Sequence, residues 1–350
     1  MSIFIKNRSR NSLFKPRIMC IFALQNLIMT RILTGTQSTG TPHLGNLLGA
    51  IIPAIEMANK SENEAYLFIA DLHSFTQIKD PKELKENTIS TAAAWLSFGV
   101  DVQKTVFYRQ SQIPEVTELM WYLLCLFPYS RLSLAHGFKD KADRLNDVNG
   151  GLFTYPMLMA ADILLYDANF VPVGKDQDQH LEFTRDVAAR FHSQFGETFV
   201  IPEGVSNDNT KIIPGTDGQK MSKSRNNYIN IFLEDKPLRK QIMSIQTDSK
   251  ELEDPKDPDT CNVFALYRLM ASEPQIEEMR SLYLAGGYGY GHAKQALFEL
   301  IIEKYKEQRE KYWYLMQNQD EIIDALKIGE AKARAYAKTV LERVRNKVGY

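Results

Sequence analysis

The sequence predicts an α/β protein with a doubly wound parallel sheet of the Rossmann type, followed by an all-helical C-terminal part. In the first two thirds of the chain, short apolar and β-branched runs alternate with segments whose apolar residues recur at helical spacing. This alternation is typical of a parallel sheet covered by helices. Beyond about residue 233, glycine loops become rare and long amphipathic helical patterns take over. We therefore expect two domains, residues 29–232 and 233–350, after an N-terminal extension over residues 1–28.

Three buried strands and the helices between them are predicted for the first domain. Runs of apolar and β-branched residues predict strands at 31–34, 66–70 and 105–108. Apolar residues at helical spacing predict helices over 44–55 and 82–98. Because such sheets bind ligands at the carboxyl ends of their strands, the loops that follow the three strands are expected to meet in one site. These loops cover residues 34–42, 71–74 and 109–112.

Charge and cysteine content exclude several classes of protein. The chain has 42 basic and 43 acidic residues, so contact with a nucleic acid would need a local basic patch. The three cysteines, Cys20, Cys125 and Cys261, are far apart in the sequence. This spacing argues against a disulfide framework or a cysteine zinc site and favours the cytoplasm. No run of about 18 apolar residues occurs, so we expect no membrane span.

Residues 1–28 differ from the rest of the chain, because they contain five basic residues and no acidic ones. Three interpretations remain open. The segment could be an organellar transit peptide, which would move the protein out of the cytoplasm. A signal peptide fits less well, because no small-residue cleavage site follows the apolar run at 18–24. We favour an upstream extension, expected to be disordered, with Met29 as the functional start.

A first motif, His43-Leu-Gly-Asn46, lies between the first predicted strand and helix. A helix N-terminus offers free N–H groups and partial positive charge, which suit a phosphate group. Gly45 would allow close approach of a ligand, and His43 could donate to a phosphate oxygen. The alternative is a simple turn rich in glycine and proline.

A second motif, Lys220-Met-Ser-Lys-Ser224, follows the turn-forming segment at 214–218. Two lysines three residues apart on a mobile loop would stabilise the negative charge that develops on a transferring phosphate. A solvated basic loop is the alternative for most short lysine pairs.

Together the two motifs resemble those of the class I aminoacyl-tRNA synthetases, which activate an amino acid with ATP. The usual first motif is His-x-Gly-His, and Asn46 replaces its last residue, as is common in the tryptophan and tyrosine branches. The resemblance implies catalytic roles for His43, Asn46, Lys220 and Lys223. It implies ATP contacts from Gln37, Ser38, Thr39, Gly45, Asn46, Gly174, Lys175, Asp176, Ile212, Lys220, Met221, Ser222, Lys223 and Ser224.

A third segment, 155–162, resembles the amino-acid pocket of the bacterial tryptophanyl branch. Tyrosyl relatives usually carry glutamine three residues before the aspartate, where this chain has Met159. Indole has one N–H donor and no acceptor, so a buried Asp162 would pair with it, and Met159 would pack on the ring. Ordinary helix core, with Asp162 as a surface charge, is the alternative. The resemblance also places Tyr155, Gln177 and His73 at the tryptophan, although His73 could equally be a structural hydrogen-bonding residue.

In the fourth segment, 173–180, the resemblance implies that Asp176 contacts the ATP ribose and that Gln177 contacts the amino group of the substrate. Lys175 stands where relatives often carry glutamate, which leaves a role for its side chain open. A polar helix start with aspartate caps is the alternative.

Helical patterns over 293–314 and 321–348 complete the second domain, which by resemblance reads the tRNA anticodon. Its end carries the basic residues Lys332, Arg334, Lys338, Arg343, Arg345 and Lys347. We favour contact with RNA phosphates over a solvated helix face.

The resemblance also implies the partners L-tryptophan, ATP with Mg²⁺, tRNA(Trp) and a second copy of the chain in a homodimer. No fixed protein-bound metal is expected, because acidic ligands are not clustered. A tyrosyl enzyme, a small nucleotidyltransferase and a non-catalytic RNA-binding relative are the competing interpretations. The last of these should have lost His43, Lys220 or Lys223, and all three are present.

Overall fold

The computed structural model describes residues 30–350 except 61–62, 136–147, 173, 175–176 and 206–212. The extension at 1–28 and the expected ATP contacts Lys175, Asp176 and Ile212 therefore lie outside the described residues. Among the described residues, no helix is both long and apolar enough to cross a bilayer.

A parallel sheet forms the centre of the first domain, as predicted. Among the described residues it has five strands in the order β3-β2-β1-β4-β5. They are β1 (Thr30–Thr36), β2 (Asn63–Ile69), β3 (Val106–Arg109), β4 (Phe170–Pro172) and β5 (Glu203–Val205). The chain proceeds outward from β1 to β3 and then returns to the other side of β1. The switch point, where such sheets bind ligands, is therefore between β1 and β4.

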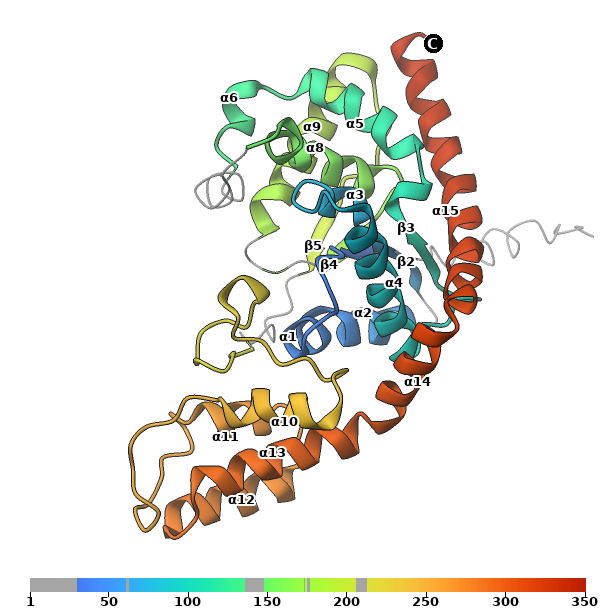
Figure 1. Cartoon of the computed structure of the whole chain (residues 1–350). Helices are drawn as coiled ribbons and strands as arrows, with labels where there is room; N and C mark the ends of the chain where they lie inside the picture. The colour runs from blue at the N-terminus through green and yellow to red at the C-terminus, as the bar shows by residue number, and fades with distance from the viewer. Residues whose placement is uncertain (1–29, 61–62, 136–147, 173, 175–176, 206–212) are drawn as a thin grey trace, which may run out of the picture.

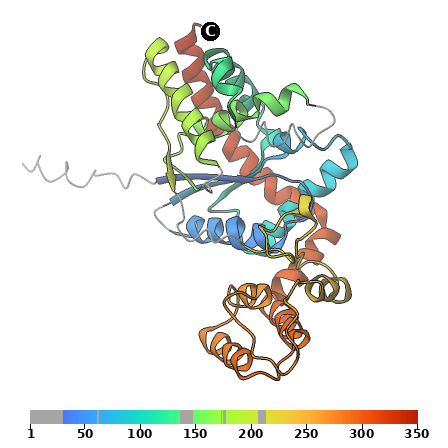
Figure 2. The same cartoon turned by 90° about the vertical axis from the view of Figure 1, so that its left-hand side faces the viewer.

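Helices cover both faces of the sheet (Figures 1 and 2). One face packs on α1 (Leu44–Asn46), the π-helical turn η1 (Leu47–Ile51), α2 (Ile52–Ala58) and α4 (Pro81–Ser97). The other packs on α5 (Glu115–Leu126), α8 (Gly150–Leu164) and α9 (Asp178–Phe195). Because successive strand residues point to opposite faces, Phe107 enters the first core and Tyr108 the second. Short turns complete the domain: α3 (Asp71–Ser74), η2 (Gln110–Gln112), α6 (Tyr129–Leu132) and η4 (Lys223–Arg225).

The C-terminal region is helical, but it does not form one unit. It comprises α10 (Asp235–Met243), α11 (Asn262–Tyr267), α12 (Glu273–Ala285), α13 (Tyr290–Lys304), α14 (Lys306–Gln317) and α15 (Gln319–Val348). The helix predicted over 293–314 is thus two helices separated at Tyr305. Helices α10–α13 lie below the sheet, α14 leads back to α4, and α15 runs along β3 and α5 (Figure 1).

Helix α15 covers the edge strand β3, which would otherwise expose unpaired backbone groups. A Cβ built on Gly329 would lie 1.9 Å from the Phe107 carbonyl oxygen, so only glycine allows this close approach. One residue later, Glu330 accepts from Arg109 Nε at 2.6 Å and from its Nη2 at 3.2 Å.

The basic residues of α15 differ from the expected RNA-binding cluster, because most of them bind the first domain. Lys332 Nζ donates to the Gln103 carbonyl at 2.8 Å. Three arginines bind carboxylates of the α/β part, in the pairs Arg334–Glu115, Arg343–Asp167 and Arg345–Glu118. These arginines therefore fasten α15 to the α/β domain. The sequence could not show this, because the acidic partners are about 170–230 residues away along the chain.

We predict that Gly329→Ala lowers the free energy of unfolding by about 1–3 kcal/mol, because the added methyl group meets backbone rather than a flexible side chain. Gly291→Ala in α13 is the matched control, since nothing lies within 4 Å of its built Cβ. Denaturant unfolding of the three proteins measures the difference. Equal stability of the two variants would contradict the close approach of α15 to β3.

Candidate functional site

Two adjoining cavities lie at the carboxyl ends of the central strands. The first has a volume of about 500 Å³ and is lined by residues of β1, β2, β4 and β5. The second, of about 700 Å³, shares Gly35 and Gln37 with the first. The site therefore spans the switch point between β1 and β4.

All five residues predicted for the amino-acid side of the site line the first cavity: Tyr155, Met159, Asp162, Gln177 and His73. Three of them recur on α8 at spacings of four and three, which places their side chains on one helix face. Apolar residues such as Pro53, Phe68 and Ile163 form much of the remaining wall. The cavity thus has the character of a pocket for a large apolar ring with one polar group.

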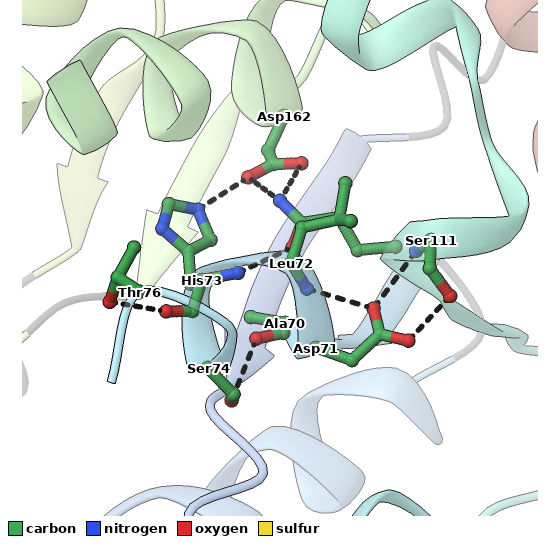
Figure 3. A network of polar contacts seen from close by, with 9 residues as sticks. Ala70, Asp71, Leu72, His73, Ser74, Thr76, Ser111 and Asp162 are labelled. Atoms are coloured by element: carbon green, nitrogen blue, oxygen red, sulfur yellow. Dashed lines mark hydrogen bonds and ion pairs between the residues drawn. The ribbon is translucent and has the colours of Figure 1, made fainter. Parts of the chain in front are cut away.

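Asp162 is the buried charge in this wall, with 2% of its surface exposed. Its Oδ2 lies 3.1 Å from His73 Nε2, and Gln110 Nε2 donates to both oxygens, at 2.9 and 2.8 Å (Figure 3). Burial raises the pKa of the carboxyl group, and the bonds from His73 and Gln110 oppose that rise. His73 lines the cavity and also lies within hydrogen-bond distance of Asp162, so the structure shows the structural contact that the sequence left open.

Asp71 joins the loop after β2 to the loop after β3. Its Oδ1 accepts from the Leu72 and Ser111 backbone N–H groups at 3.1 and 2.9 Å, and its Oδ2 accepts from Ser111 Oγ (Figure 3). Burial raises the pKa of Asp71, and its bonds to Ser111 oppose that rise. Neither Ser111 nor Gln110 was singled out from the sequence, although the loop at 109–112 was expected at the site. The sequence feature that could have indicated these two residues is the polar run directly after the third strand.

The two sequence motifs meet at the second cavity. Its wall contains residues of the first motif and its loop, together with Ser222, Lys223 and Ser224 of the second. Contributions from the first are Gln37, Thr39, Gly40, His43 and Asn46. Met221 fastens the motifs together, because the Gly45 N–H donates to its sulfur at 3.2 Å.

His43 caps the helix that begins at Leu44. The Asn46 backbone N–H donates to His43 Nδ1 at 3.2 Å, and Asn46 Oδ1 accepts from the His43 backbone N–H at 3.1 Å. Burial and the nearby positive charge of Lys223 lower the pKa of His43 to about 4. The ring is therefore neutral near pH 7. Since a backbone N–H can only donate, Nδ1 is unprotonated and the proton lies on Nε2.

Lys223 supplies the positive charge at this cavity. Its Nζ donates to the Thr39 carbonyl at 3.1 Å, and burial lowers its pKa to about 8. Asn227 shapes the loop, since its Oδ1 accepts from the Ser222 N–H and its Nδ2 donates to Asp217 and to the Lys220 carbonyl. This residue was not found from the sequence, because its function is to satisfy backbone groups of a turn.

Four residues expected to contact ATP line neither cavity: Ser38, Gly45, Lys220 and Met221. Ser38 is fully buried, and its N–H and hydroxyl donate to Ser74 Oγ at 2.8 and 3.1 Å. Met221 is buried against Gly45, whereas Lys220 is exposed on the loop. Gly174 lines the first cavity rather than the second.

Comparisons with known proteins agree with this geometry. Residues 28–306 match the family described as class I tRNA synthetases (W and Y). The chain is 47% identical to the tryptophan–tRNA ligase of Rhodopirellula baltica, over 91% of this chain and 99% of that protein. The tryptophanyl-tRNA synthetase of Campylobacter jejuni, solved with ADP and tryptophan, is 44% identical and has a TM-score of 0.87, covering 92% of this chain and 100% of that one. The enzyme of Mycoplasma pneumoniae is 30% identical, with a TM-score of 0.78 over 92% and 98% of the two chains.

We predict that the His43 ring carries its proton on Nε2 and stays neutral down to about pH 5. Protonation of Nδ1 would break its hydrogen bond from the Asn46 N–H and would place a second positive charge near Lys223. Long-range ¹H–¹⁵N NMR of the ring nitrogens across pH 4–8 measures the tautomer and the titration. A ring that titrates near the ordinary value of about 6.5 would contradict this environment.

Proposed function

This chain belongs to the tryptophanyl- and tyrosyl-tRNA synthetase family of class I, and we infer that it is the enzyme that ligates L-tryptophan to tRNA(Trp) with ATP. The observation that carries the choice of amino acid is Asp162, a buried carboxylate in the wall of an otherwise largely apolar cavity. The adjoining cavity, where both motifs meet, accommodates the nucleotide.

Tryptophan enters the first cavity with its indole N–H directed at Asp162. An indole N–H that is buried without a partner costs about 1–3 kcal/mol, so the carboxylate selects for it. Met159 and Ile163 pack on the wide ring, and Gln177 binds the α-amino group. Tyrosine is the competing substrate, but Met159 offers a phenolic hydroxyl little, because its thioether sulfur is a weak acceptor.

The first step is attack of the tryptophan carboxylate on the α-phosphate of ATP, which forms tryptophanyl-adenylate and releases pyrophosphate. His43 donates through Nε2–H and Asn46 through its amide, and neither adds a charge. Lys223 stabilises the charge on the transferring phosphate and the leaving pyrophosphate. Lys220, exposed on the same loop, reaches the phosphates only if the loop moves. Mg²⁺ accompanies ATP through its phosphates. Outside the described residues, the family resemblance assigns nucleotide contacts to Asp176, Ile212 and Lys175, with the role of the Lys175 side chain left open.

The second step transfers the tryptophanyl group to the terminal ribose of the tRNA. We place the anticodon contact on α10–α13, because most basic residues of α15 bind the first domain. Helix α10 presents Lys236, Arg239 and Lys240 around a third cavity of about 850 Å³.

The enzyme acts in the cytoplasm as a homodimer. The exposed aromatic side chains Trp121 and Tyr129, 63% and 76% exposed, support a partner surface at α5 and α6.

ATP–pyrophosphate exchange with each of the twenty amino acids tests the proposed function. We expect exchange with tryptophan to exceed exchange with tyrosine by about 10⁴-fold or more, because the pocket pairs one polar group of its ligand. Comparable exchange with tyrosine would contradict the specificity, and exchange with neither would contradict the function.

We predict that Lys223→Ala lowers kcat for adenylate formation at least 100-fold and changes the tryptophan KM little, because the charge acts mainly in the transition state. Arg225→Ala, two residues along the same loop, is the control and should retain activity. A Lys223→Ala protein with normal kcat and only a raised tryptophan KM would show that the lysine has no role in charge stabilisation.

A further inference from the structure

We propose that Gln110 is the positioning residue that sets Asp162 for recognition of the indole N–H. The proposal rests on the tryptophan specificity inferred above and adds a residue to it. Gln110 is 1% exposed and is absent from the wall of the tryptophan cavity, so it acts through Asp162 rather than on the substrate.

The side-chain amide of Gln110 binds two neighbours at once. Its Nε2 donates to both oxygens of Asp162, at 2.9 and 2.8 Å, and its Oε1 accepts from the His73 backbone N–H at 3.3 Å. His73 in turn places its ring Nε2 3.1 Å from Asp162 Oδ2 (Figure 3). The Gln110 amide therefore orients the Asp162 carboxylate and also holds the backbone of His73, the other residue that contacts Asp162.

This arrangement leaves Asp162 with acceptor capacity for a ligand. A carboxylate has about four lone-pair sites, and Gln110 and His73 occupy three of them. Within the part of the chain that the structure describes, Oδ1 receives a bond from Gln110 alone. Because a buried carboxylate without donors would be driven toward its neutral form, these bonds also keep it an acceptor.

Gln110 is itself held from both sides along the chain. The preceding residue, Arg109, binds Glu330 of α15 through Nε and Nη2. The following residue, Ser111, donates to Asp71 from its backbone N–H and its hydroxyl. The amide therefore projects from a short turn whose two ends are anchored on different elements.

Ionisable groups of the network around Gln110 lie on α3, α8, β3 and α15. Gln110 contacts His73 and Asp162 directly, and these connect through further contacts to Asp71, Tyr155, Tyr108, Tyr166, Arg109 and Glu330. A second carboxylate at position 110 would thus face Asp162 in a nearly closed, buried environment.

Two substitutions separate positioning from structure. Gln110→Met keeps the length but removes both hydrogen-bonding groups, so the tryptophan KM should rise roughly 10- to 100-fold with the ATP KM unchanged. Preference for tryptophan over an analogue with sulfur in place of the indole nitrogen should fall by a similar factor. Gln112→Met, at an exposed residue in the same turn, is the matched control and should match the wild type.

Gln110→Glu supplies a readout that a purely structural role would not change. Two carboxyl groups at hydrogen-bond distance share one proton, whose O–H can replace the amide donor. That proton leaves as pH rises, and the two charges then repel. We therefore expect the tryptophan KM of Gln110→Glu to approach wild type near pH 6 and to exceed it at least tenfold near pH 8.5.

Exchange kinetics of the full chain at pH 6–8.5, with melting temperatures for each protein, decide the outcome. Tryptophan KM and analogue preference that stay at wild-type values in Gln110→Met overturn the role of Gln110 while leaving the proposed function intact. If Gln110→Met does not fold, the profile of Gln110→Glu decides: a flat ratio to wild type overturns the role. Wild-type protein without tryptophan-dependent exchange overturns both proposals.

Discussion

The burial of one carboxylate, Asp162, is the constraint on which the amino-acid side of the site depends. A charge that is 2% exposed requires donors, and the chain supplies His73 and Gln110 from the ends of two neighbouring strands. Those donors must themselves be fixed, and Asp71 and Ser111 connect their loops. Each buried polar group needs a hydrogen-bond partner, and that partner is itself held by a further hydrogen bond. The side chains of the site therefore depend on one another.

At the second cavity, the proposed nucleotide side, Lys223 is the lysine that the described residues place in the wall. Two of its donors, His43 and Asn46, bind each other's backbone groups and stay neutral, so the positive charge comes from the loop of Lys223. The Met221 sulfur and the Lys223 amine hold that loop on the first motif. A positive charge placed beside the first motif suits a reaction in which negative charge develops on the transferring phosphate.

The sequence was sufficient for the fold class, the first three strands and the two motifs, because these are encoded locally by periodicity and by short runs of residues. Family resemblance also selected five residues that line the first cavity, and the structure shows that three of them share one face of α8. It did not reveal Gln110 or Asn227, whose importance comes from backbone and carboxyl groups that only the folded chain brings near. It also did not show that the Ser38 hydroxyl binds Ser74, because a loop hydroxyl beside a nucleotide motif looks the same in sequence whatever it faces.

The largest difference between sequence and structure concerns α15. Its amphipathic pattern and basic residues suggested part of an RNA-binding domain, because periodicity identifies a helix but not the surface that it covers. Gly329 allows α15 to approach the backbone of Phe107 closely. A single glycine in a helical pattern does not indicate such a contact. Once α15 lies on β3, Glu330 meets Arg109, the residue before Gln110. The last helix of the chain therefore packs on the first domain, and it anchors the strand whose end carries Gln110 to Asp162 in the proposed tryptophan pocket.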